Sequence, residues 1–156
     1  MKHIFLSALG ALILATTPPT LAQETQPNAP LVQDAMGVTL DDFKWVNRIV
    51  VVFADSPLDP SFRQQMDLLA QRPERLSERD VIVLTDTVPD TLSEVRKSLR
   101  PRGFAIVVVD KDGTVMLRKP DPWDVRELSH AIDKTPLRQQ EIQDIKNAAR
   151  AARTLQ

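Results

Sequence analysis

Two aspartates frame a junction where the chain changes from an apolar run to a helical pattern. Asp55 and Asp59 flank Ser56-Pro57-Leu58, directly after the apolar segment Ile49–Ala54. Carboxylates at this spacing could share a proton or bind a hard cation. A purely structural role would also account for both aspartates. Asp55 stands where a turn is expected to begin before a proline. Asp59 stands where a helix N-cap is expected before Pro60.

A second acidic motif, Asp110-Lys111-Asp112-Gly113-Thr114, follows the apolar segment Ile106–Val109. Strand-Asp-x-Asp is the nucleophile arrangement of haloacid-dehalogenase-like phosphatases, in which one aspartate attacks phosphorus. Asp-Gly between two β-rich runs also predicts a hairpin, since glycine readily adopts the positive φ that such turns need. The residues after the motif have mostly helical patterns, and this context favours the hairpin.

Other catalytic arrangements are poorly supported. Ser56 could act as a nucleophile only beside a positioned base, and His130, the one histidine after residue 22, lies in a distant helical segment. The chain contains no cysteine, which removes disulfides, thiolate metal sites and thiol redox chemistry. We therefore expect that the protein holds no metal and no cofactor. We also expect a binding domain in preference to an enzyme.

Charge also limits the partners. The formal net charge is −1, and charged residues make up 26% of the chain, so no global field favours nucleic acid or a membrane surface. Basic residues recur at Arg96-Lys97, Arg100, Arg102 and Arg118-Lys119. Without interleaved aromatic residues they are expected to be solvated charges near helix and strand ends, and we expect no nucleic-acid partner.

Hydrophobic patterning predicts the elements that carry these residues. Apolar runs indicate strands at 49–54, 81–84, 104–109 and 115–117. Helical spacing indicates a helix over 60–71, a second opening at Pro89-Asp90-Thr91 with Leu92, Val95 and Leu99 on its buried face, and a third capped by Asp121-Pro122 with Val125, Leu128 and Ile132 buried. The resulting order, β-α-β-α-β-β-α, is the thioredoxin-like arrangement of the α/β class. A doubly wound α/β domain is the alternative, and it would need parallel strands in place of the hairpin.

The two ends of the chain are expected to lie outside this domain. Residues 1–22 have a basic start, a short apolar run and small residues before a cleavage point after Ala22, which predicts a signal peptide and a periplasmic or secreted protein without a membrane anchor. Residues 23–38 are expected to form a disordered leader and residues 39–135 the domain. Residues 136–156 are expected to form an extra helix, whose stripe of Ile142, Ile145, Ala149 and Ala152 could dock on another chain or cover its own sheet.

Three segments resemble a bacterial family of exported proteins, domain of unknown function 4174, which is related to the peroxiredoxin-like "DUDES" domains of animal sushi-repeat matrix proteins. They are Leu40 and Phe43 with Trp45–Ala54, then Arg79-Asp80, and finally Ile132–Glu141. The resemblance implies a thioredoxin-like fold without an established activity. At the thioredoxin active-site position the chain has Ser56–Asp59 in place of Cys-x-x-Cys. Pro57, Ser61 and Gln64 keep the peroxiredoxin spacing, with Gln64 where the reactive cysteine would be.

These observations predict an exported, non-catalytic domain that binds a protein or small ligand at the former active-site end. The candidate contact residues are Trp45, Asp55, Ser56, Asp59 and Arg63, because we expect them to gather near the N-terminus of the first helix. Trp45 could instead pack against the sheet edge. The alternative is a thiol-independent, metal-assisted hydrolase or phosphatase that uses Asp55 and Asp59, or Asp110 and Asp112.

Overall fold

A five-stranded mixed sheet organises the chain, and the computed structural model describes it over residues 32–154. The strands are β1 (Val32–Asp34), β2 (Arg48–Phe53), β3 (Val81–Asp86), β4 (Ala105–Val109) and β5 (Val115–Lys119), in the spatial order β1-β3-β2-β4-β5. β1, β3 and β2 are parallel, whereas β4 is antiparallel to β2 and β5 to β4. The predicted βαβ unit and hairpin are therefore confirmed.

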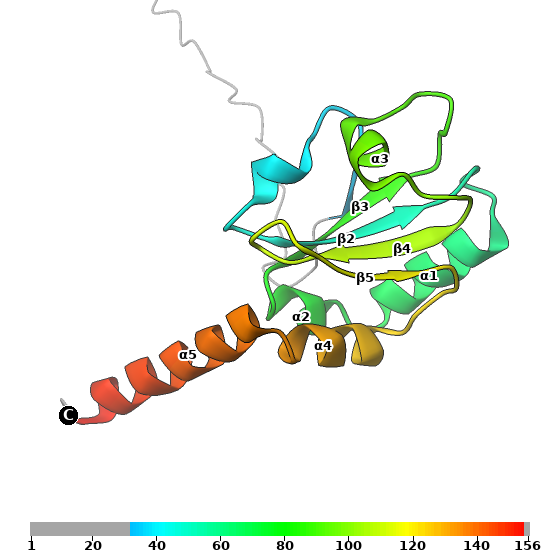
Figure 1. Cartoon of the computed structure of the whole chain (residues 1–156). Coiled ribbons are helices and arrows are strands. Elements are labelled where there is room, and N and C mark those ends of the chain that lie inside the picture. The colour runs from blue at the N-terminus through cyan, green and yellow to red at the C-terminus, as the bar shows by residue number, and fades with distance from the viewer. Residues whose placement is uncertain (1–31, 155–156) are drawn as a thin grey trace, which may run out of the picture.

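Helices cover both faces of this sheet. One face carries α1 (Pro60–Ala70), α2 (Pro73–Ser77) and α4 (Val125–Asp133), and the other carries α3 (Glu94–Leu99) and the short 3-10 helix η1 (Leu40–Phe43) (Figure 1). The central strand β2 is buried along its whole length. Val50 and Val52 pack under α1 and α4, while Ile49, Val51 and Phe53 face α3 and η1, as expected for alternating side chains on a doubly covered strand.

The first helix begins as its sequence predicts. Asp59 accepts hydrogen bonds from the backbone N–H groups of Ser61 and Phe62, and Pro60 occupies the first helical position, where a missing N–H costs nothing. Inside α1, Gln65 is completely buried. Its amide donates to the carbonyl of Trp123 at 3.1 Å and accepts from the Trp123 N–H at 2.7 Å, which ties α1 to the segment before α4.

Two of the other predicted helices, α3 and α4, start later than their sequences indicated. The N-cap of α3 is Ser93, which accepts from the N–H of Arg96, so Leu92 remains outside the helix with 58% of its surface exposed. The N-cap of α4 is Asp124, and not the predicted Asp121. In both cases a side chain closer to the apolar stripe satisfies the free N–H groups. An additional short helix, α2, which was not predicted, begins at Pro73.

The prediction of a disordered leader over residues 23–38 is wrong at its C-terminal end, which belongs to the folded domain. Residues 32–34 form β1, the edge strand beside β3, and Ala35 is fully buried next to it. This strand is held by backbone hydrogen bonding, which a short aperiodic sequence does not reveal. The predicted signal peptide lies outside the described residues.

The last helix, α5 (Pro136–Thr154), leaves the body of the protein and projects away from it (Figure 1). Arg138 is buried and Glu141 half-buried against the domain, but every residue from 143 to 154 is exposed. The helix therefore does not cover its own sheet. Within residues 32–154 no helix combines the length and the hydropathy needed to cross a bilayer.

Candidate functional site at the strand ends

A pocket lies at the carboxyl ends of β2 and β3, beside α3 and the segment that leads into β4. This is the edge where open α/β sheets usually bind ligands. The pocket has a volume of about 540 Å³. We call it the strand-end pocket, and its lining residues are Asp55, Pro89, Leu92, Arg96, Lys97, Arg100, Pro101 and Gly103.

A buried ion pair forms the floor of the strand-end pocket. Arg96 donates to the Asp86 carboxylate from Nε at 3.0 Å and from Nη2 at 2.8 Å, and Nη2 also reaches the carbonyl oxygens of Asp86 and Ala54. Ser93 donates to the second Asp86 oxygen at 2.7 Å. The guanidinium lies 5.2 Å from the centre of the Phe53 ring. Arg96 is therefore a structural cation that joins the ends of β2 and β3 to α3.

This ion pair corrects the prediction that Arg96 is a solvated charge, since only 7% of the residue is exposed. The sequence did contain a sign that a buried cation was needed. Asp86 follows the buried apolar run of β3, and a carboxylate buried there needs a partner of opposite charge. The distance of ten residues between Asp86 and Arg96 is not a helical spacing, so sequence periodicity did not connect them.

Arg100 is an exposed cation at the rim of the strand-end pocket. It follows the last residue of α3 with φ of 47°, a left-handed conformation that usually belongs to glycine and costs an arginine roughly 1 kcal/mol. Asp55 lines the same pocket, and a Cβ added to Gly103 would lie 3.9 Å from its carboxylate. Lys97, by contrast, is paired with Glu94 at 2.7 Å.

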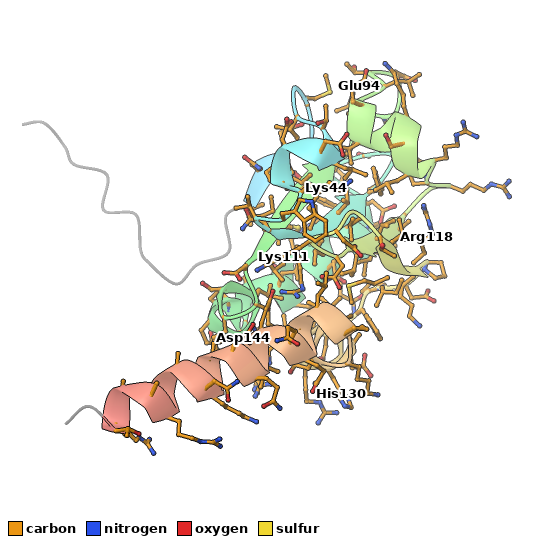
Figure 2. All side chains as sticks on the ribbon, turned by 60° about the vertical axis from the view of Figure 1, so that its left-hand side comes forward. Lys44, Glu94, Lys111, Arg118, His130 and Asp144 are labelled. Carbon is orange, nitrogen blue, oxygen red and sulfur yellow. The ribbon has the colours of Figure 1, made fainter. Side chains whose placement is uncertain are left out.

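A second hollow continues the surface beyond Arg100 and Pro101, which line both. We call it the basic hollow; its volume is about 210 Å³, and its lining residues are Arg100, Pro101, Arg102, Phe104, Ala105, Val107, Arg118, Lys119 and Pro120. No acidic residue is among them. Arg118 is positioned by a hydrogen bond to the carbonyl of Leu99 at 2.6 Å, and Lys119 lies 4.8 Å from the Trp123 ring centre. Figure 2 shows Arg118 and Glu94 on separate sides of α3.

The structure brings together only part of the predicted site. Asp55 lines the strand-end pocket, whereas Asp59 serves as the α1 cap and Ser56 accepts a local hydrogen bond from the N–H of Leu58. Arg63 is exposed on α1, as is Gln64. The roles of Asp59 and Ser56 are thus those of cap and turn.

Trp45 lies at the other end of the sheet, so its grouping with Asp55 is wrong. It precedes β2 and Asp55 follows it, and a strand of six residues separates them by roughly 20 Å. Trp45 does not pack on the sheet edge either, because 65% of it is exposed. Its φ is 65° and its N–H donates to the carbonyl of Lys111 at 2.6 Å.

The aspartates of the hydrolase alternative have structural partners. Asp110 is buried, lies 2.9 Å from Nε of Arg48 and accepts from the N–H of Lys111. Asp112 accepts from the N–H of Thr114, and Gly113 has φ of 89°, as in the predicted hairpin. Among residues 32–154 no three or more His, Asp or Glu side chains form a cluster suited to a metal ion.

A charged cluster at the opposite end of the sheet fixes the root of α5. Arg48 is fully buried and donates to both oxygens of Glu141, at 3.1 and 3.2 Å, and Lys111 and Arg138 also contact Glu141. Burial alone would raise the pKa of Glu141, but hydrogen bonds from Arg48, Lys111 and Arg138 outweigh it and lower that pKa from 4.5 to about 2.

A parallel βαβ unit followed by an antiparallel hairpin and a covering helix defines the thioredoxin-like class of α/β proteins. A solved thioredoxin structure agrees with this assignment. The chain is similar to chloroplastic thioredoxin z, with a TM-score of 0.52 and 20% identity over 67% of this chain and 93% of that one. It is also similar to the reduced 2-Cys peroxiredoxin of Plasmodium vivax, with a TM-score of 0.49 and 15% identity over 70% and 85% of the two chains.

Within that class, residues 39–141 match the family described as Domain of unknown function (DUF4174), so the chain belongs to this family. The match ends at Glu141, the residue that anchors α5. No curated protein matches the sequence.

Proposed function

We propose that this chain is an exported, non-catalytic binding domain, and that it holds a small ligand or peptide bearing an acidic group at the strand-end pocket and the adjoining basic hollow. The absence of cysteine removes thiol chemistry from a thioredoxin-like scaffold. The strand-end pocket remains at the edge where open α/β sheets usually bind ligands. Export is supported by the composition of residues 1–22.

The conformation of Arg100 carries this proposal. Non-glycine residues persist in the left-handed region when something other than local stability favours them. Arg100 keeps that conformation at the point where the two hollows meet, with its side chain exposed. A glycine would fit the end of α3 better. We therefore infer that the arginine is kept for its side chain, which can contact a ligand.

The charges favour an acidic ligand group. Arg102, Arg118 and Lys119 add to Arg100 along the basic hollow, and guanidinium groups bind carboxylates or phosphates through paired hydrogen bonds. Apolar surface from Pro89, Leu92 and Pro101 adjoins them in the strand-end pocket. Asp55 would then accept a hydrogen bond from a donor on the same ligand.

Nuclear magnetic resonance tests this proposal directly. A library of small carboxylates, phosphates and short acidic peptides is titrated into isotope-labelled protein, and shifts are mapped along the backbone. We expect the shifts to concentrate at residues 54–56, 89–92 and 100–104, and to disappear in Arg100→Ala. Arg63→Ala is the matched control, because it removes an exposed arginine outside both hollows. Shifts elsewhere, or equal binding by Arg100→Ala, would contradict the proposed site.

A further inference from the structure

Two exposed apolar features share one end of the molecule, opposite the strand-end pocket. The first is the projecting part of α5, residues 143–154, all of which are exposed. The second is the pair Trp45 and Val46, which are 65% and 63% exposed. We propose that they form one interface, in which α5 of one copy of this chain packs on Trp45 and Val46 of a second copy and the contact is repeated reciprocally.

The α5 stripe has the spacing of a packing seam. Ile142, Ile145, Ala149 and Ala152 recur at intervals of three and four residues, which places them along one side of the helix. Ile145 is 62% exposed, and the two alanines allow another surface to approach closely. A helical segment of this length is marginally stable alone in water, so a partner would stabilise it.

Trp45 has the properties of an anchor for such a helix. Buried tryptophans often dominate the binding energy of interfaces, and here the ring is exposed in the isolated chain. Its φ of 65° is unfavourable for a bulky side chain, and the backbone bond to Lys111 maintains it. Val46 extends the apolar surface beside it.

The two features are linked through one residue. Lys111 accepts the Trp45 N–H with its carbonyl and contacts Glu141 with Nζ at 2.9 Å, which connects the patch to the root of α5. In the view of Figure 2, Lys111 lies between Lys44 and α5. Because α5 is one unbroken helix fixed at Arg138 and Glu141 and points away from the body, its own stripe cannot fold back onto Trp45.

Charge complementarity favours a second copy as the occupant. Residues 143–154 carry Lys146, Arg150 and Arg153 against a single acid, Asp144. The exposed acids Asp41 and Asp42 of η1 lie just before Trp45 in the chain and outnumber the one exposed cation among residues 41–46, Lys44. A two-fold axis would bring each basic α5 to the acidic neighbourhood of the other copy's Trp45, as the self-complementary interfaces of dimers require.

Sedimentation velocity of the chain as isolated from cells tests this inference. From about 1 µM to about 300 µM, a range suited to a small interface, we expect wild type to pass from monomer to dimer. Ile145→Lys and Trp45→Gly should each weaken dimerisation at least about tenfold. Asn147→Lys, which adds the same charge at an exposed α5 position off the seam, should change the affinity less than about twofold. Circular dichroism at the lowest concentration verifies that each variant is folded.

Mixing the two weakened variants tests the reciprocal geometry. A heterodimer of Trp45→Gly with Ile145→Lys retains one intact contact, the unaltered α5 of the first chain on the unaltered Trp45 of the second. We therefore expect the mixture to associate more tightly than either variant alone. A wild type that stays monomeric throughout, equal effects of Ile145→Lys and Asn147→Lys, or a mixture no tighter than its components would overturn the proposal.

Discussion

Arg48 and Glu141 are separated by 93 residues in the chain and form a two-pronged ion pair, Nη1 to Oε2 at 3.1 Å and Nη2 to Oε1 at 3.2 Å. The pair connects the first residue of the central strand to the root of the last helix. Asp110 and the carbonyl of Arg79 complete the surroundings of the buried guanidinium. Removing Glu141 would leave the buried guanidinium of Arg48 with much less opposing negative charge, which would destabilise the folded state.

Glu141→Ala should therefore lower the free energy of unfolding by about 3 kcal/mol, the range found when one partner of a buried ion pair is removed. Urea titration followed by circular dichroism measures this. Asp144→Ala is the control, since Asp144 is an exposed carboxylate on the same helix and accepts a hydrogen bond from the neighbouring Gln140. Equal losses in the two variants would show that Glu141 is not an anchor.

Stability should also fall in acid because of Glu141. In the folded state the pKa of Glu141 is about 2, below its ordinary value of 4.5. The ionised Glu141 therefore contributes fully to the free energy of unfolding above pH 4.5, and this contribution is lost as the pH falls through 2. After allowance for solvent screening, we expect it to supply roughly 2 kcal/mol of the decline. Asp133, whose pKa is also lowered by Arg79 and Arg138 against the opposing effect of burial, contributes in the same direction.

The matching measurement is unfolding at a series of pH values from about 6 to about 2. Glu141→Gln should start less stable and show a shallower decline. A decline as steep as that of wild type would assign the acid sensitivity to other carboxylates.

The Arg96–Asp86 pair should show strong coupling. Arg96→Leu leaves Asp86 buried with only Ser93 as a side-chain partner, and we expect a loss of about 3 kcal/mol. Replacing both residues by leucine should cost less than the sum of the single changes, because no uncompensated charge remains. A double-mutant cycle by urea unfolding gives the coupling energy, and additive losses would contradict a buried, mutually dependent pair.

Shortening α5 should separate its anchored and projecting parts. Among the described residues, ending the chain after Ile142 removes residues 143–154, all of which are exposed. At low protein concentration this truncation should change the free energy of unfolding by less than about 1 kcal/mol. Ending it after Thr135 also removes Arg138 and Glu141, and should destabilise the domain by about 3 kcal/mol or more. Equal effects of the two truncations on the melting temperature would rule out a boundary at Glu141.

The sequence predicted the thioredoxin-like arrangement because its signals are local. The apolar run of β2, the cap at Asp59 and the Asp-Gly turn at Gly113 each act within a few residues. The misplaced starts of α3 and α4 arose where several polar residues could cap and only tertiary packing selects one.

The candidate site was less predictable, because its contacts join distant residues. Asp55 was placed at the correct end of the sheet, since it directly follows the central strand. Trp45 was not, because the direction of a strand separates residues that are near in sequence. Arg96 was interpreted as a solvated cation because its partner Asp86 is brought to it only by the fold. Arg100 was noticed only as part of a basic run, since nothing in the sequence shows its positive φ.

Arg100→Gly gives the most direct test of the binding account, because stability and binding should change in opposite directions. Glycine relieves the left-handed conformation, so thermal unfolding should show a stabilisation of roughly 1 kcal/mol. Calorimetric titration with the acidic compound that shifts the pocket resonances most should show affinity reduced at least about tenfold, the loss of one charge-assisted contact. A variant that is more stable and binds that compound as tightly as wild type would contradict the proposed role of Arg100 and, with it, the site.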